Sequence, residues 1–118
     1  MTLDEFFDGQ EKSRELFETV RSVIDTIGDA ALCVTKSQIA FRRRKTFALI
    51  WMPGEYLRGD SAPLVLTLSF RSPDPSPRWK EIVEPSPGRF THHLELHSIE
   101  DIDDQVCDWL RNAWQAAV

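Results

Sequence analysis

Apolar side chains repeat at helical spacing near both ends of the chain. Over residues 11–27 and again over residues 98–114 they recur every three or four positions, which predicts one amphipathic helix in each segment. The first stripe consists of Leu16, Phe17, Val20, Val23, Ile24 and Ile27. The second consists of Ile99, Ile102, Val106, Trp109, Leu110, Ala113 and Trp114. Gly28 is placed to end the first helix, and Ser98 to cap the second.

Between the two helices, the period changes from helical spacing to alternation, which is typical of strands. The predicted strands cover residues 30–35, 39–44, 46–52, 64–70 and 90–97. Prolines at 73, 75 and 77 forbid regular pairing there and predict a flexible loop, and residues 85–88 read as a turn. Residues 79–83 fit either a short strand or a helical turn.

This order of elements predicts a single α+β domain over residues 1–118. Strands joined by short turns favour an antiparallel sheet, here of four to five strands. Two amphipathic helices need a surface to pack against, so we expect a two-layer sandwich with both helices on one sheet face. The other face would be open or used in association.

Composition excludes several classes of protein. No run approaches the ~20 apolar residues of a membrane helix, and the acidic start, Met1 to Glu5, does not resemble a signal peptide. The chain has two cysteines, Cys33 and Cys107, which we expect to be reduced, buried and inert. We therefore expect a cytoplasmic protein that does not enter the membrane.

Charge is unevenly distributed along the chain, whose formal net charge is -5. Residues 1–35 and 90–118 are acidic, whereas residues 36–89 hold ten bases and five acids. Acidic helices behind a basic sheet would make the open face the cationic side of the molecule. The overall acidity, and the lack of a nucleic-acid-binding signature, disfavour nucleic acid as a partner.

Four consecutive cations, residues 42–45, lie at the hairpin between the strands predicted over residues 39–44 and 46–52. Strand alternation places Arg42 and Arg44 on one face, about 6.5–7 Å apart, and Arg43 on the other. The arginine fork suits carboxylates and phosphates, so this hairpin, together with Lys36, is a candidate site for a small anion. The alternative is that these cations form a solvated hairpin, or that they pair with the acidic helices.

The histidines of residues 92–97 point to alternate faces. His92 shares its side with Leu94 and Leu96, which predicts a hydrogen-bonded core histidine, whereas His93 falls on the open face and joins the anion-site residues. Residues 93, 95 and 97 resemble a metal set, but consecutive side chains on one strand face are ~7 Å apart, which is too wide for easy chelation. No metal is therefore expected at this strand.

Catalytic signatures are missing from the sequence. There is no GxSxG motif, and no glycine-rich phosphate loop surrounds Lys36. We therefore expect neither enzymatic activity nor a cofactor. Trp51, Trp109 and Trp114 are expected in the core, whereas Trp79, after the proline-rich loop, is a candidate to line a cleft or an interface.

Several motifs resemble a family of small bacterial domains of unknown function. The motifs are Thr35-Lys36-Ser37-Gln38-Ile39-Ala40-Phe41-Arg42, Phe47-Ala48-Leu49-Ile50-Trp51, Val83-Glu84-Pro85, Gly88-Arg89-Phe90-Thr91-His92-His93, Ile102-Asp103 and Trp109-Leu110. The resemblance implies a fold but no activity. In architecture the chain is also similar to the YdhG-like domains, some of which are described as frataxin-like iron carriers.

The sequence thus favours a binding module that recognises a small anion or a protein partner through the open sheet face, with contacts from Lys36, Arg42, Arg44 and His93. Two alternatives remain. One is a frataxin-like metal carrier that uses the acids Asp101, Asp103, Asp104 and Asp108, although such acids also suit a solvated helix start. The other is a domain that self-associates through its sheet as a homodimer.

Overall fold

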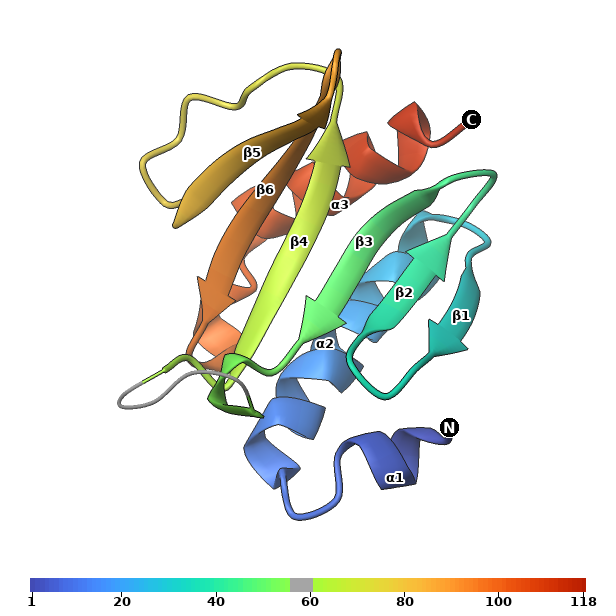
Figure 1. Cartoon of the computed structure of the whole chain (residues 1–118), viewed down its shortest axis with the longest axis vertical. Coiled ribbons are helices and arrows are strands. Elements are labelled where there is room, and N and C mark those ends of the chain that lie inside the picture. The colour runs from blue at the N-terminus through green and yellow to red at the C-terminus, as the bar shows by residue number, and fades with distance from the viewer. Residues whose placement is uncertain (56–60) are drawn as a thin grey trace.

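The computed structural model describes residues 1–55 and 61–118, which form helices and a sheet in two layers (Figure 1). The helical elements are α1 (Leu3–Phe6), α2 (Glu11–Ile27), η1 (Pro53–Glu55), η2 (Ile99–Asp101) and α3 (Asp104–Ala116). The strands are β1 (Ala31–Val34), β2 (Ile39–Arg42), β3 (Thr46–Trp51), β4 (Leu64–Phe70), β5 (Glu81–Ser86) and β6 (Arg89–Leu96). Among the described residues, no helix combines the length and apolarity needed to span a membrane.

The sheet has six strands in the order β1-β2-β3-β4-β6-β5, and every neighbouring pair is antiparallel. The predicted α+β class and antiparallel sheet are confirmed, but the sheet has six strands and not the expected four to five. The additional strand is β5, which contains Pro85 although residues 85–88 were expected to form a turn. A proline is tolerated there because β5 is an edge strand, where one row of backbone donors needs no partner in the sheet.

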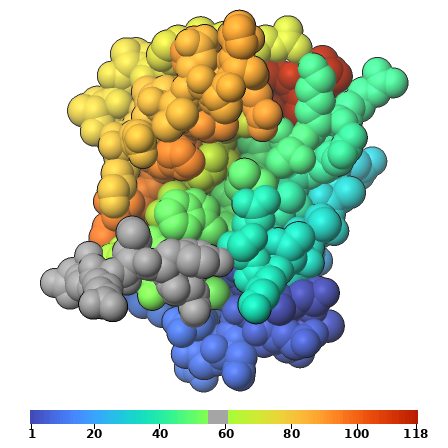
Figure 2. Space-filling view, viewed as in Figure 1, coloured from blue at the N-terminus to red at the C-terminus, as the bar shows by residue number. Residues whose placement is uncertain are grey.

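Helices α2 and α3 lie against the same face of the sheet, as the hydrophobic stripes predict (Figure 1). The core between the layers is built from leucine and isoleucine of the central strands and the apolar stripes of both helices. Among the described residues, no helix crosses the centre of the opposite face, where side chains of the strands form the surface (Figure 2). Within this part of the chain, helices therefore cover one face and leave the other open.

The predicted start of the last helix is wrong by several residues. Ser98 caps the short η2 turn, whereas α3 begins at Asp104. Its N-cap is Asp103, whose carboxylate accepts a hydrogen bond from the Val106 N–H at 3.1 Å. The apolar stripe continues through both elements, so spacing alone does not reveal the break at Ile102. The helix over residues 11–27 and its Gly28 C-cap are confirmed.

Three other expectations need correction. Cys33 is exposed on β1 and Cys107 is half-buried on α3, so neither belongs to the core. Trp79 is buried, because its ring stacks on Trp109 with centroids 4.1 Å apart. Trp51 and Trp114 are only partly buried.

Candidate functional site

Cations gather at one end of the sheet. In an antiparallel sheet, the end of β2, the start of β3, the end of β4 and the start of β6 all lie at the same end. That end carries the β2–β3 hairpin with Arg42, Arg43, Arg44 and Lys45, then Arg71 after β4 and Arg89 at the start of β6.

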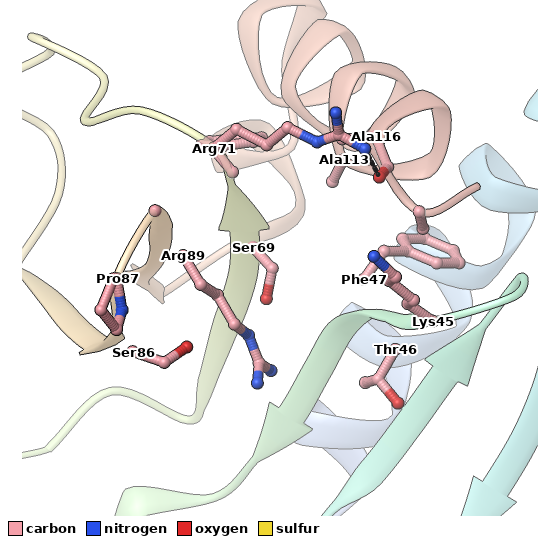
Figure 3. A pocket seen from close by; sticks show the side chains of 13 residues that line it. Lys45, Thr46, Phe47, Ser69, Arg71, Ser86, Pro87, Arg89, Ala113 and Ala116 are labelled. Atoms are coloured by element: carbon pink, nitrogen blue, oxygen red, sulfur yellow. Dashed lines mark hydrogen bonds between the residues drawn. The ribbon is translucent and has the colours of Figure 1, made fainter.

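A pocket of about 510 Å³ opens among these residues, and we call it the sheet-end pocket (Figure 3). Three cations line it from three separate segments: Lys45, Arg71 and Arg89. Figure 3 shows Arg71 reaching toward Ala116, and Arg89 directed between Ser86 and Thr46. The remaining lining residues are Thr46, Phe47, Ser69, Phe70, Ser86, Pro87, Gly88, Ala113, Ala116 and Ala117. None of the described lining residues is acidic.

The C-terminus of α3 forms one wall of the sheet-end pocket. The backbone N–H groups of Arg44 and Lys45 donate to the Ala117 carbonyl at 3.1 and 3.3 Å. Arg71 Nη2 donates to the Ala116 carbonyl at 3.3 Å. These bonds satisfy carbonyls that a helix leaves unpaired at its C-terminal end, where cations are also favoured by the helix dipole. These hydrogen bonds therefore hold the hairpin and the residue after β4 against the end of the helix.

Arg43 also holds the hairpin against α3 and does not line the pocket. Its guanidinium lies 3.6 Å from the centroid of the Trp114 ring, a cation–π contact, and donates to the Trp114 carbonyl at 3.2 Å. Arg43 thus faces α3, on the opposite side from Arg42, as strand alternation predicts.

The cations at this end of the sheet have no acidic partner among the side chains that the structure describes. Within residues 1–54 and 61–118, no carboxylate lies within 4.0 Å of the side-chain nitrogens of Lys45, Arg71 or Arg89, nor of those of residues 42–44. Elsewhere, Arg78, Lys80 and Arg111 each form an ion pair. Pairing of the hairpin with the acidic helices is not seen among the described side chains, whereas the exposure of Arg42 and Arg44 agrees with the other alternative, a solvated hairpin.

The four residues predicted from the sequence do not come together. Arg42 and Arg44 are exposed at the cationic end, where Arg42 Nε donates to the Arg44 carbonyl at 3.2 Å. Lys36 lies in the β1–β2 turn, at the opposite end of β2, beside Glu5 and Asp8 in another hollow. His93 lies in the middle of the sheet, opposite Thr67.

His93 lines a smaller hollow on the open face, together with Ser37, Gln38, Leu49, Trp51 and Thr67. Its Nδ1 lies 2.7 Å from the Thr67 hydroxyl oxygen. Burial lowers the pKa of His93, although nearby Glu81 opposes the shift. A neutral imidazole is a weaker partner for an anion than the unpaired arginines and lysine of the sheet-end pocket.

The open face is not the cationic layer expected from the charge distribution. Its central row runs across Ala40, Leu49, Thr67, His93 and Glu81, with Arg42 toward one end. The positive charge is instead concentrated where strand ends meet. Figure 2 shows side chains of the β2–β3 hairpin, in green, beside the C-terminal segment, in red, at that end.

Sequence reasoning missed Arg71 and Arg89, because each is a single base with no charged neighbour in the sequence. Their shared position follows only from the pairing of β4 with β6, in which Phe70 faces Phe90. The signal available in the sequence was the excess of bases across the whole middle segment, which did not indicate where those bases would meet.

The chain matches one family of known domains over nearly its whole length. A family described as a domain of unknown function (DUF5655) matches residues 3–117. The chain belongs to this family. No curated protein and no solved structure matches it. Membership in DUF5655 agrees with the expected uncharacterised domain and assigns no activity.

In this DUF5655 domain, three of the four acids proposed for metal binding make other contacts. Asp101 accepts from the backbone N–H groups of His97 and Ser98, and Asp108 pairs with Arg111. Asp103 pairs with Arg78 and caps α3, and these hydrogen bonds lower its pKa. Within the part of the chain that the structure describes, no three His, Cys, Asp or Glu side chains are grouped to hold a metal ion.

Proposed function

We propose that this domain is a binding module for a small anion, which it holds in the sheet-end pocket. The observation that carries the proposal is the meeting of Lys45, Arg71 and Arg89 around one pocket, with no acid among its described lining residues. Unpaired cations are unfavourable neighbours, because their mutual repulsion raises the energy of the folded state. An anion in the pocket would relieve that repulsion.

The size and chemistry of the pocket support a ligand rather than a structural role. Ligand sites typically enclose about 300–1,000 Å³, with an apolar lining and a few charged or hydrogen-bonding groups. The sheet-end pocket falls in this range and combines the rings of Phe47 and Phe70 with hydroxyl groups and cations. Charge-assisted hydrogen bonds from arginine to an oxyanion are also about twice as strong as neutral ones.

This proposal keeps the anion predicted from the sequence and changes the residues that hold it. Arg42 and Arg44 border the same end but do not line the pocket, and Lys36 and His93 lie elsewhere. A cytoplasmic location, the absence of enzymatic activity and a protein partner or homodimer stay predictions of the sequence.

Two charge-matched double variants test the proposal. Arg71→Gln/Arg89→Gln removes two cations that line the pocket, whereas Arg42→Gln/Arg44→Gln removes two cations outside it. Binding of inorganic phosphate would be measured for both by isothermal titration calorimetry. Since a hydrogen bond to a charged group contributes about 1.5–3 kcal/mol, each lost contact should weaken binding about tenfold or more.

The first variant is expected to lose phosphate binding and the second to retain most of it. Both variants lose the same net charge. If phosphate were bound only by general electrostatic attraction, its affinity would therefore fall equally in both. Equal weakening, or a larger loss in Arg42→Gln/Arg44→Gln, would contradict the assignment of the pocket.

A further inference from the structure

We infer that the ligand of the sheet-end pocket is a phosphate monoester with a compact apolar group. This inference rests on the proposed function, because it assigns a chemical class to the anion held there. It follows from two unlike parts of the same pocket, a cationic rim and an apolar lining.

The cationic rim suits a dianion with several terminal oxygens. Lys45, Arg71 and Arg89 come from the β2–β3 hairpin, the end of β4 and the start of β6, so they approach from different directions. A phosphate monoester offers three terminal oxygens and nearly two negative charges, whereas a carboxylate offers two oxygens and one charge. A carboxylate would compensate one of the three cations, whereas a phosphate monoester would compensate nearly two.

Hydroxyl groups near the cations add neutral donors. Thr46, Ser69 and Ser86 line the same pocket, and each can donate one hydrogen bond to an oxyanion. Figure 3 shows the Arg89 guanidinium directed between Ser86 and Thr46. This arrangement places the charged donor Arg89 close to neutral donors in one part of the pocket.

The apolar lining is larger than an oxyanion alone would use. Phe47 is buried and Phe70 is partly buried. Ala113 and Ala116 of α3 and the C-cap residue Ala117 add small apolar surfaces. Small side chains on that helix leave room next to the two rings, in a pocket of about 510 Å³. An alkyl or aryl group attached to the phosphate would cover this surface and exclude water from it.

A ligand series with a fixed head and a growing body tests the inference on the unmodified protein. The series is inorganic phosphate, methyl phosphate, butyl phosphate and phenyl phosphate, with butyrate as the carboxylate control, measured by isothermal titration calorimetry. Burial of each methylene strengthens binding about fourfold at most. We expect butyl and phenyl phosphate to bind at least tenfold more tightly than inorganic phosphate, and butyrate to bind more weakly than butyl phosphate.

Ala116→Leu provides the matched variant, because the larger side chain fills the apolar part and leaves all three cations in place. Ala116 is partly exposed at the last turn of α3, so the change is tolerated better there than at buried Ala113. In this variant the preference for butyl or phenyl phosphate over inorganic phosphate, both measured on the variant itself, is expected to disappear; a preference equal to that of the unmodified protein would contradict the inference.

The outcomes separate the two proposals. Equal affinities for inorganic, methyl, butyl and phenyl phosphate would overturn the inference and leave the anion site standing. Tighter binding of butyrate than of butyl phosphate, or of a short oligonucleotide than of phenyl phosphate, would overturn it in favour of another ligand class. Failure of inorganic phosphate and every ester to bind would overturn the proposed function itself.

Discussion

Arg71 contributes both to the fold and to the proposed site. Its guanidinium donates to the Ala116 carbonyl of α3, and it also lines the sheet-end pocket. Arg89, by contrast, is exposed, and no ion pair or hydrogen bond to its side chain is found among the described residues. Substitution of Arg71 should therefore affect both binding and stability, whereas substitution of Arg89 should affect binding alone.

We expect Arg71→Gln to weaken phosphate binding and also to lower the free energy of unfolding by about 0.5–1.5 kcal/mol, since it removes one hydrogen bond to the helix end. Arg89→Gln should weaken binding to a similar degree and change stability by less than about 0.5 kcal/mol. Urea denaturation together with calorimetric titration measures both quantities. A stability loss in Arg89→Gln equal to that in Arg71→Gln would contradict the separation.

His92 explains how the proline-rich segment after β4 is held without regular structure. The imidazole is fully buried, and its Nε2 accepts a hydrogen bond from the Asp74 N–H at 3.0 Å. The Asp74 carboxylate in turn accepts from Trp79 Nε1 at 2.9 Å. The predicted core histidine is thus confirmed, and the segment expected to be a flexible loop is bonded to β6.

Burial lowers the pKa of His92, against opposing effects of the Phe90 carbonyl and Asp74. The unfolded chain therefore takes up a proton near the ordinary histidine pKa of about 6.5, while folded His92 resists it. We expect the free energy of unfolding to fall as pH drops from about 7.5 to about 5.5, by at most about 1.4 kcal/mol per pH unit for this residue.

His92→Phe should show a smaller loss over the same pH range, and His93, whose pKa is also lowered, should account for the remainder. The variant leaves the Asp74 N–H without its acceptor, so at about pH 7.5 it should be less stable by about 1–3 kcal/mol. Urea denaturation at both pH values measures these effects. An unchanged pH dependence in His92→Phe would contradict the role given to His92.

At the scale of elements, the contact between α2 and α3 depends on Gly28. A methyl group added at Gly28 would lie 2.3 Å from Cζ2 of Trp114, which is closer than real atoms approach. Trp114 cannot easily move away, because its Nε1 donates to the Asp29 carbonyl at 2.9 Å and Arg43 covers its ring.

Gly28→Ala is therefore expected to destabilise the protein by about 1–3 kcal/mol through overpacking. In a Trp114→Leu background the same substitution should cost much less, because the clashing ring is gone. A double-mutant cycle in urea denaturation measures this coupling. Identical costs in both backgrounds would show that the ring is not the obstacle.

The edge strand β5 bears on self-association. Its residues are all exposed, including Ile82 and Val83, and its outer side is unpaired within the described part of the chain. However, Glu81, Glu84 and Pro85 are residues that discourage edge-to-edge pairing, and the pairing with β6 is irregular between Val83 and Ser86.

We accordingly expect no association through β5 in the unmodified protein. Sedimentation velocity should show a shift toward dimers or larger species in Glu81→Val/Pro85→Val, which restores a backbone donor and removes a charge. A dimeric unmodified protein that this change leaves unaltered would favour association through another surface.

At the scale of the whole molecule, the sequence predicted the layers better than the site. Amphipathic spacing in α2 and alternation in β4 reflect which side chains are buried, so the helix over residues 11–27 and the strand over residues 64–70 match the observed bounds. The sequence does not distinguish a strand from a helical turn over residues 79–83, and it predicts a turn over residues 85–88. The six residues of β5 are all exposed, and an exposed strand carries no burial pattern.

The site was harder to predict because it is assembled from strand ends. Arg42 and Arg44 were chosen for their position in a run of like charge, whereas Arg71 and Arg89 come together only through the order of the sheet. Local alternation indicates the face on which a residue lies, but not which distant residue lies beside it. The uneven charge along the chain predicted a cationic open face. The cations instead occupy one end of the sheet.

The most direct measurement is an NMR titration of the isotopically labelled protein with inorganic phosphate. The account predicts that amide shifts change most at Arg71, Gly88, Arg89 and Ala116, around the sheet-end pocket. Shifts centred on Lys36 and His93, or no shifts at any phosphate concentration, would contradict it.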